Sequence, residues 1–436
     1  NGSSEGAYFH SNYQCNSERM KKLIFSIVIL FGQDFRAQEQ LTLEKCYALV
    51  EKNYPLAKQN NLLQNQSELE AIVLAKDKLP KISFHAQASY QSDVTQVPFS
   101  MPNVTMEPLN KDQYRATLDI NQLIYNGGTI KAQTQLKATQ IKSQQQVAIV
   151  NLYQLKSQVN QYYFGLLLSQ ERQELLQAKK VLLEEKSKEI QTAVKFGAVL
   201  PASEQVIEAE IININQQLSD ITLEQLKLWK NLELLSGQVF HPTTILSQPT
   251  HFETERSGIR PELVLFDLQN QQVEAAQKVI ETTHAPKLNA FLQGGYGNPA
   301  LNMLNNSFET FYMTGLRLNW TLFEWNKTKK EKEVLELSKQ IILTEKETFE
   351  VNQNRQLNEY NFEIEKINAQ LKSDLEIIQL REKIVRSAEA QMKNGVITSS
   401  DYLNEVTHLF ESKINEKTHH IQLLLAKANY QIISGI

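Results

Sequence analysis

The stretch Ile82-Ser83-Phe84-His85-Ala86-Gln87-Ala88-Ser89-Tyr90 decides the fold, because apolar residues occupy its even positions. An alternation with a period of two is typical of a β-strand that has one apolar and one polar face. The same alternation returns in Tyr114-Arg115-Ala116-Thr117-Leu118-Asp119-Ile120. A loop is predicted between the two runs by three prolines: Pro98, Pro102 and Pro108. We therefore predict two strands, at about 82–97 and 113–125.

Outward from these strands, the period changes to that of an α-helix. Upstream, residues 41–79 have helical spacing that Pro55 interrupts. Downstream, the chain contains no proline from Gly128 to about Lys195, and its apolar residues recur at alternating spacings of four and three: Ala148, Leu152, Leu155, Val159, Tyr162 and Leu166. This spacing predicts a coiled-coil seam. At ~1.5 Å per residue the helix would be about 100 Å long.

The long helix is predicted to be one arm of an antiparallel hairpin. Gly197 ends it, and a second helix runs from near Pro201 to Leu235. The same order of elements then returns: a helix at 262–282, strands at about 288–297 and 309–323, and a helix from 327 to 392 that Gly395 ends before a last helix at 401–433.

Short stretches also match between the two halves. Pro80-Lys81-Ile82 aligns with Pro286-Lys287-Leu288, and Lys195 and Gly197 align with Lys393 and Gly395. We interpret the shared order as an internal duplication. The first repeat spans 38–237 with its hairpin tip near 197, a proline-bearing equatorial linker spans 238–261, and the second repeat spans 262–436 with its tip near 395.

The N-terminal segment is predicted to be an export signal. Met20-Lys21-Lys22 precedes a short apolar run from Leu23 to Phe31, and a small residue follows at Ala37. This is the pattern of a secretory signal, here residues 20–37. The run is too short to cross a bilayer, which takes about 20 residues. Residues 1–19 are interpreted as a non-native or upstream leader.

Composition excludes several classes of protein. The chain has 436 residues but only 15 glycines and 11 prolines, which favours long uninterrupted helices. A net charge of −4 gives no case for nucleic acid as a partner. No Gly-rich phosphate loop, His-Glu-x-x-His motif or nucleophile elbow is present. We therefore predict neither an enzyme nor a protein with a cofactor or metal.

The two-faced strands fit either a soluble sandwich or a membrane barrel with a polar lumen. The export signal and the aromatic residues near the strand ends favour the barrel. Four strands cannot close one, since about eight is the smallest number known, so the chain must associate. Two copies would give eight strands and three would give twelve. Four charged residues are then predicted to line the lumen: Asp93, Arg115, Asp119 and Arg317.

Three motifs resemble the TolC-type outer membrane efflux protein family, with a likeness that extends over residues 38–436. Lys78-Leu79-Pro80-Lys81-Ile82 enters the first strand, and Leu123-Ile124-Tyr125-Asn126-Gly127-Gly128 leaves the second. At the second hairpin tip, Lys393-Asn394-Gly395-Val396-Ile397-Thr398-Ser399-Ser400-Asp401-Tyr402-Leu403 is similar to the family's pattern of a glycine, a hydroxyl residue and an acid. At the first tip, Leu200-Pro201 and Ser203 depart from it. Glu324-Trp325-Asn326 departs from the family's aromatic-acid-Gly-Gly turn.

The resemblance implies a mainly α fold with membrane β structure. It implies a homotrimer whose four strands per chain complete a twelve-stranded barrel in the outer membrane of a Gram-negative bacterium. Coiled-coil hairpins would form an α-barrel in the periplasm, docked to a periplasmic adaptor and an inner-membrane transporter. The expected function is an exit duct for tripartite efflux of small molecules. Two alternatives are a duct for type I protein secretion and a soluble periplasmic coiled-coil scaffold.

The resemblance also nominates residues at the periplasmic end. Asp401 is a candidate for an acidic constriction ring, with Tyr402 and Lys393 as gate partners. Asp401 could instead only cap the last helix, since acids are common at helix starts. Hairpin-tip residues are the candidates for adaptor docking: Gly197, Pro201, Ser203, Gly395, Thr398 and Ser400.

Overall fold

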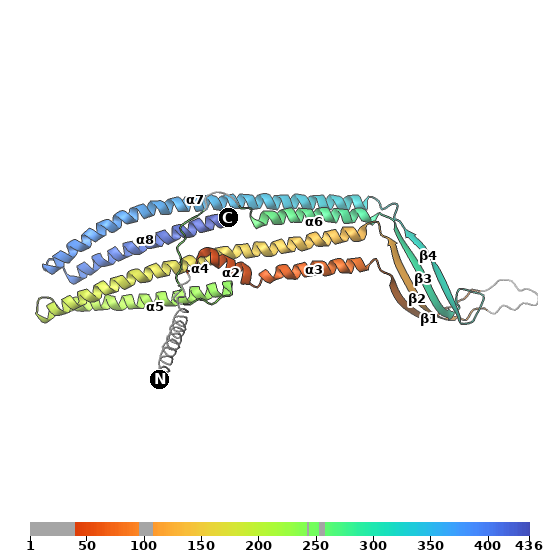
Figure 1. Ribbon diagram of the computed structural model, residues 1–436, viewed down its shortest axis with the longest axis horizontal. Coiled ribbons are helices and arrows are strands. Elements are labelled where there is room, and N and C mark those ends of the chain that lie inside the picture. Colours follow the sequence, from red (N-terminus) through yellow and green to blue (C-terminus); the bar gives the residue numbers. More distant parts are fainter. Residues whose placement is uncertain (1–39, 96–107, 242–243, 253–257) are drawn as a thin grey trace, which may run out of the picture. The chain divides into compact units, whose positions relative to one another are not determined.

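The computed structural model describes residues 40–95, 108–241, 244–252 and 258–436 (Figure 1). The predicted leader and signal sequence lie outside these residues. The described chain forms two compact units, and α2, α4, α7 and α8 contribute residues to both. The first unit comprises 40–49, 159–241, 244–251 and 374–421. The second comprises 50–95, 108–158, 252, 258–373 and 422–436.

The first half of the chain contains helices and strands close to those predicted. They are α2 (Leu43–Asn53), α3 (Ala57–Lys76), β1 (Lys81–Tyr90), β2 (Asp112–Tyr125), α4 (Thr129–Lys195) and α5 (Ala202–Ser236). The break between α2 and α3 contains Pro55, which has no N–H to donate to a helix. The 67 residues of α4 form one uninterrupted α-helix.

The second half repeats the order of a helix, two strands and two helices. Its elements are α6 (Pro261–Thr283), β3 (Lys287–Asn298), β4 (Glu309–Asn319), α7 (Lys327–Lys393) and α8 (Ser399–Ser434). Pro261 starts α6 at a position where a missing N–H costs nothing. Like α4, α7 is an uninterrupted helix of 67 residues.

Two predicted strands were too long. β1 ends at Tyr90 instead of 97, because Tyr90 pairs with Asp112, the first residue of β2, and polar residues interrupt the alternation after it. β4 ends at Asn319 instead of 323, because its partner there is Lys287, the first residue of β3. Pro286 precedes Lys287 and has no N–H to extend the ladder.

The strands form one antiparallel sheet in the order β1-β2-β3-β4. The pairing of β2 with β3 joins the two halves of the chain, and it sets Asp119 opposite Gln293. β1 and β4 are the two edges, and no described strand pairs with their outer sides. Each edge therefore presents a row of backbone groups that pair with nothing in the described chain.

The turns that lead from the strands into the long helices have the same conformation in both halves. Gly127 and Gly128 have φ angles of 65° and 84°, and Trp325 and Asn326 have 55° and 62°. Glycine adopts such left-handed angles without steric cost, whereas a side chain with a Cβ costs roughly 1–2 kcal/mol. The sequence departure at Trp325-Asn326 has therefore not changed the turn.

Replacing Trp325 with glycine should give a protein about 1–2 kcal/mol more stable than replacing it with alanine. Both changes remove the edge-on contact between the Trp325 and Phe323 rings, but only glycine relieves the left-handed strain. The free energy of unfolding, from denaturant titration followed by circular dichroism, measures the difference. An alanine variant as stable as the glycine variant would contradict the strain.

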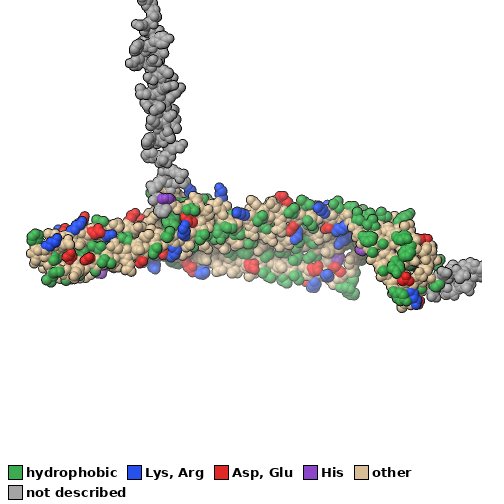
Figure 2. Space-filling model, turned by 90° about the horizontal axis from the view of Figure 1, so that it is seen from below, with side chains coloured by type: hydrophobic (Ala, Val, Ile, Leu, Met, Phe, Trp, Pro, Cys, Tyr) green, Lys and Arg blue, Asp and Glu red, His purple; other side chains and the backbone are tan. Residues whose placement is uncertain are grey.

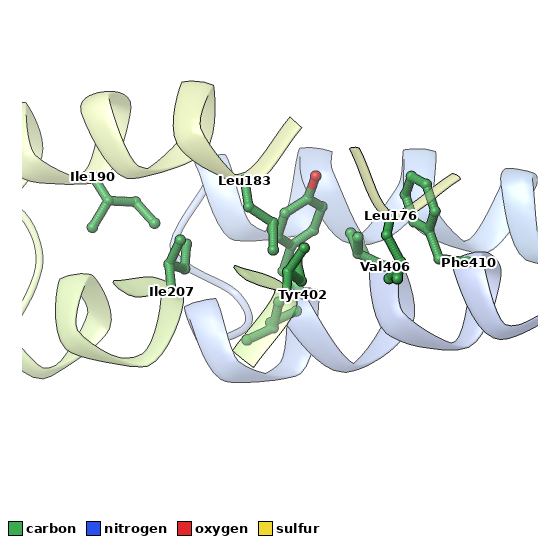
Figure 3. Packing of buried hydrophobic residues seen from close by; sticks show 10 residues of the cluster. Leu176, Leu183, Ile190, Ile207, Tyr402, Val406 and Phe410 are labelled. Carbon is green, nitrogen blue, oxygen red and sulfur yellow. The ribbon is translucent and has the colours of Figure 1, made fainter. Parts of the chain in front are cut away.

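The core of the first unit lies between the hairpin arms. Figure 3 shows Leu176, Leu183 and Ile190 of α4 among Ile207 of α5 and residues of α8. The three α4 residues are spaced by seven, which is the heptad period of a coiled coil. The hairpins therefore pack as the coiled-coil spacing predicts.

In the second unit, a buried arginine ties the start of α6 to the end of α8. Arg260 donates two hydrogen bonds to the Glu262 carboxylate, at 2.9 and 2.5 Å, and one to the Ile432 carbonyl at 3.0 Å. Its guanidinium lies over the rings of Tyr153 and Phe349. Arg260 and Glu262 are both buried, so each needs the other to offset its lost hydration.

Candidate functional site

The sheet has one apolar face that the described chain leaves exposed. The ladder sets Phe84 beside Leu118, and Leu288 beside Leu318, on this face. Phe84 and Leu316 are each 69% exposed. Eleven large apolar residues make up the face: Ile82, Phe84, Tyr114, Leu118, Ile120, Leu288, Leu292, Tyr296, Tyr312, Leu316 and Leu318. Hydrophobic side chains cover much of the strands in Figure 2. A continuous apolar face of this kind marks a surface that something else covers.

The opposite face holds three of the four predicted lumen residues. Arg115 and Asp119 lie on β2 at odd positions, and Arg317 lies on β4. Asp119 accepts hydrogen bonds from Thr117, at 2.9 Å, and from Gln293. The fourth, Asp93, follows the end of β1 in a bend, where its carboxylate accepts a bond from the Val94 N–H. Asp93 is therefore not a strand-face residue, because β1 is shorter than predicted.

The two hairpin tips share one backbone geometry. Gly197 and Gly395 have φ angles of 72° and 69°. At each tip the residue after the glycine donates its N–H five residues back: Ala198 to the Ala193 carbonyl, and Val396 to the Gln391 carbonyl. This is the Schellman motif, which ends a helix with a left-handed glycine. The structure thus places both predicted tip glycines at the turn.

Asp401 caps α8 as the simpler of the two interpretations expects. Its carboxylate accepts hydrogen bonds from the Thr398 backbone N–H, at 3.0 Å, and hydroxyl, at 2.7 Å. The Asp401 N–H donates to the Thr398 hydroxyl in return, at 3.2 Å. This reciprocal pair is a capping box with the acid at the third helical position. Ser400 lies between them, exposed, in the first turn of α8.

The first tip lacks this box. Pro201 precedes α5 without a side-chain cap, and Ser203 stands in the first turn with its N–H bonded to the Leu200 carbonyl at 3.0 Å. The sequence departure at this tip is therefore also a structural one. Three exposed apolar side chains surround the tips: Phe196, Leu200 and Val396.

The hydrogen bonds from Thr398 hold the pKa of Asp401 below its ordinary value of 3.8. A carboxyl with a lowered pKa in the folded state stabilises the fold above 3.8, and this contribution is lost as the pH falls through the lower folded value. Asp401→Asn should therefore lower the melting temperature at neutral pH and have no pH-linked effect below the folded pKa. Thermal melts followed by circular dichroism across this range test the sign. A gap between the two proteins that stays constant with pH would contradict it.

The two predicted gate partners of Asp401, Tyr402 and Lys393, differ in their exposure. Tyr402 is 1% exposed and packs in the core cluster with Leu183 and Val406 (Figure 3). Its position is set by the apolar seam between the hairpins. Lys393 is exposed at the end of α7 and lies 3.6 Å from the Glu389 carboxylate.

Two buried lysines connect the hairpins, and the sequence interpretation missed both. Lys179 bonds Glu210 of α5 at 2.6 Å and the Thr407 hydroxyl of α8 at 3.1 Å. Lys186 bonds Glu389 of α7 at 2.6 Å and Glu189 at 2.9 Å. Burial opposes the charge of Lys186, but the bonds to Glu389 and Glu189 outweigh it and raise its pKa. Their burial could have been predicted from their spacing. Lys179 and Lys186 alternate with Leu176, Leu183 and Ile190 at intervals of three and four residues, which are the buried positions of a coiled coil.

Within the described residues, no group of three or more His, Cys, Asp or Glu side chains is placed to hold a metal ion. Cys46 is fully buried, and this burial raises the pKa of its thiol to about 12. A thiol in that state is a packing group. None of the described helices is long and apolar enough to cross a membrane.

Comparisons with known proteins identify the fold. No protein-family model matches the chain, and no curated protein matches it in sequence. Among solved structures, CusC, studied for its folding and transmembrane channel formation, matches with a TM-score of 0.69 and 11% identity over 90% of this chain and 92% of its own. The outer membrane protein VceC of Vibrio cholerae matches with a TM-score of 0.65 and 13% identity over 90% of this chain and 96% of its own.

The CmeC outer membrane channel of Campylobacter jejuni matches with a TM-score of 0.62 and 16% identity, over 90% of this chain and 85% of its own. These matches cover nearly the whole length of each chain. The chain therefore has the fold of the TolC-type outer membrane channels.

Proposed function

We propose that the protein is an outer membrane channel, the exit duct of a tripartite efflux system that passes small molecules. The observation that carries the proposal is the sheet, with one exposed apolar face, one polar face and two unpaired edges. An apolar face suits lipid, a polar face suits a water-filled lumen, and unpaired edges cannot remain open in a bilayer. The fold shared with outer membrane channels supports the same assignment.

The edges are closed by further copies of the chain. In a ring, β4 of one copy pairs with β1 of the next, which leaves no free edge. Two copies would give the smallest known barrel, and three would give twelve strands. The three-copy ring is favoured by the resemblance to the TolC-type family, and it leaves a lumen wide enough for solutes.

In the second unit, the outermost helices α3 and α7 each expose apolar side chains that another copy of the chain could cover. Ion pairs connect neighbouring helices: α3 to α4 through Glu70 and Lys137 at 3.7 Å, and α6 to α7 through Glu281 and Lys332 at 2.9 Å. The outer side of α7 carries an exposed seam at alternating spacings of three and four: Val334, Leu337, Ile341, Thr344, Thr348 and Val351. α3 exposes Leu62 and Leu69. A second copy that covers these seams would close the helices in the same direction as the strands.

The hairpin tips are the proposed docking surface for a periplasmic adaptor, which in turn binds an inner-membrane transporter. Phe196, Leu200 and Val396 are exposed there, and Gly197 and Gly395 let the backbone turn without a side chain. Exposed apolar groups on a rigid turn suit a protein partner. The hairpins would accordingly lie in the periplasm of a Gram-negative bacterium.

Channel activity is the direct test of this function. Purified protein added to a planar lipid bilayer should produce discrete conductance steps of uniform size, because each inserted ring opens one lumen. The protein should also fractionate with the outer membrane when expressed with its export signal. A protein that stays in the soluble periplasmic fraction and gives no conductance would favour the coiled-coil scaffold instead.

Asp401 is proposed to form an acidic ring at the periplasmic aperture as well as a helix cap. Asp401→Ala should then raise the single-channel conductance, because the smaller alanine side chains widen the narrowest point of the pore. Thr398→Ala is the matched control, since it removes the cap but keeps the carboxylate. If both variants change the conductance equally, Asp401 acts only as a cap. Tyr402→Phe should add little, because Tyr402 is buried.

A further inference from the structure

The polar face of the sheet carries two arginines that are stacked on phenylalanines. The Arg115 guanidinium carbon lies 5.6 Å from the centre of the Phe311 ring, and that of Arg317 lies 5.2 Å from the centre of the Phe291 ring. Stacking of this kind holds a guanidinium in place while its N–H groups remain free at the edge. The same arrangement thus occurs twice on one face.

Each ring lies over a glycine on the neighbouring strand. Phe311 pairs with Gly295 and Phe291 with Gly315. A Cβ on Gly295 would lie 2.4 Å from the Phe311 ring, and one on Gly315 would lie 3.1 Å from the Phe291 ring. The glycines therefore let the rings lie flat against the sheet, and the flat rings in turn support the guanidinium groups. The strand pairing therefore fixes the positions of both phenylalanine rings and of the arginines stacked on them.

The two arginines are not neutralised by the described chain. Among the residues that the structure describes, no carboxylate lies within ion-pair distance of Arg115 or Arg317. Asp119, on the same face, is instead engaged by Thr117 and Gln293, with His85 3.8 Å away. The positive charges of Arg115 and Arg317 are thus available to a solute, whereas Asp119 keeps its negative charge and opposes them on the same face.

The charge balance of this face is positive. The odd strand positions carry four cations, Lys81, Arg115, Lys287 and Arg317, against two carboxylates, Asp119 and Glu309. Of the cations, Lys81 is paired with Asp77 at 3.0 Å, just outside the strand. Rings of basic side chains attract anions into a pore and repel cations. Repetition of the face in each copy would multiply the effect.

We propose that the sheet's polar face selects for anionic solutes, such as carboxylates, sulfonates and phosphates, through Arg115 and Arg317. The proposal rests on the proposed channel function, with this face toward the lumen. The phenylalanines act as positioning residues that hold the guanidinium groups at fixed points on the wall. Inorganic chloride is a sufficient probe, because the attraction is one of charge.

The test is the reversal potential of the full-length channel in a planar bilayer under a potassium chloride gradient. The variant Arg115→Gln with Arg317→Gln should lower the chloride-to-potassium permeability ratio by about twofold or more. Arg115→Lys with Arg317→Lys keeps the charges and should keep the ratio. Asp119→Asn should raise it. Any constriction elsewhere in the channel is the same in all variants. A difference in permeability ratio between variants therefore comes from the substituted residues of the sheet.

Lys287→Gln provides a second route if the double arginine variant fails to fold. It removes one charge from the same face without disturbing either ring stack, so the ratio should fall by a smaller amount. An unchanged ratio in the glutamine variants would overturn the anion selectivity while leaving the channel intact. The absence of conductance from the unmodified protein would overturn the channel function and the selectivity together.

Discussion

Replacing Arg260 with alanine should lower the free energy of unfolding by about 3–5 kcal/mol. The change leaves the buried carboxylate of Glu262 without its partner, since both bonds at 2.9 and 2.5 Å come from Arg260. The Ile432 carbonyl keeps one donor, because the Tyr153 hydroxyl bonds it at 2.7 Å. The loss therefore comes chiefly from the unpaired charge. Denaturant titration of the detergent-solubilised protein measures it.

The double variant Arg260→Met with Glu262→Leu is the matched control. It removes both charges and replaces them with apolar side chains that fill similar space, so most of the lost stability should return. If the double variant is as unstable as Arg260→Ala, the ion pair is not the cause, and the contacts of Arg260 with the Tyr153 and Phe349 rings would have to account for the loss.

Replacing Gly127 with alanine should be comparably severe. Its φ angle of 65° is left-handed, which costs a Cβ-bearing residue roughly 1–2 kcal/mol. In addition, a Cβ there would lie 2.0 Å from the Ala285 Cβ, and overpacking of this kind typically costs about 1–3 kcal/mol. We expect a total loss of about 2–5 kcal/mol in the free energy of unfolding.

Gly197→Ala separates the two contributions to that loss. Gly197 has a similar φ angle of 72°, but no atom lies within 4 Å of a Cβ built there. It should lose only the conformational part, roughly 1–2 kcal/mol. Equal losses at Gly127 and Gly197, measured by the same titration, would mean that the chain around Ala285 moves aside freely.

Elements with a strong local period could be predicted from the sequence. The alternation from Ile82 to Tyr90 predicted β1, and the seam through Val159 predicted α4, because strands and coiled coils impose their period on every residue. Glycines between two apolar helices predicted the hairpin turns, which need a left-handed residue. These features depend on neighbours close in the chain.

Features that depend on distant neighbours were missed. Lys179 and Lys186 are buried because carboxylates from α5 and α7 reach them, and no local pattern reveals those partners. The burial of Tyr402 was also missed, because it depends on α4 residues that pack against this side chain of α8. Trp325 has a left-handed φ angle, which its side chain disfavours. The only sequence signal for this conformation was the glycine at the equivalent turn in the first half, Gly127.

Three copies of this chain are expected to close one barrel with their sheet edges. Light scattering of the detergent-extracted protein, with the detergent contribution subtracted, tests it most directly. We expect a complex of three mature chains, recovered from the outer membrane fraction, in which every β1 and β4 edge is paired. A monomer that is soluble without detergent would contradict it, because the exposed apolar face of the sheet would then face water.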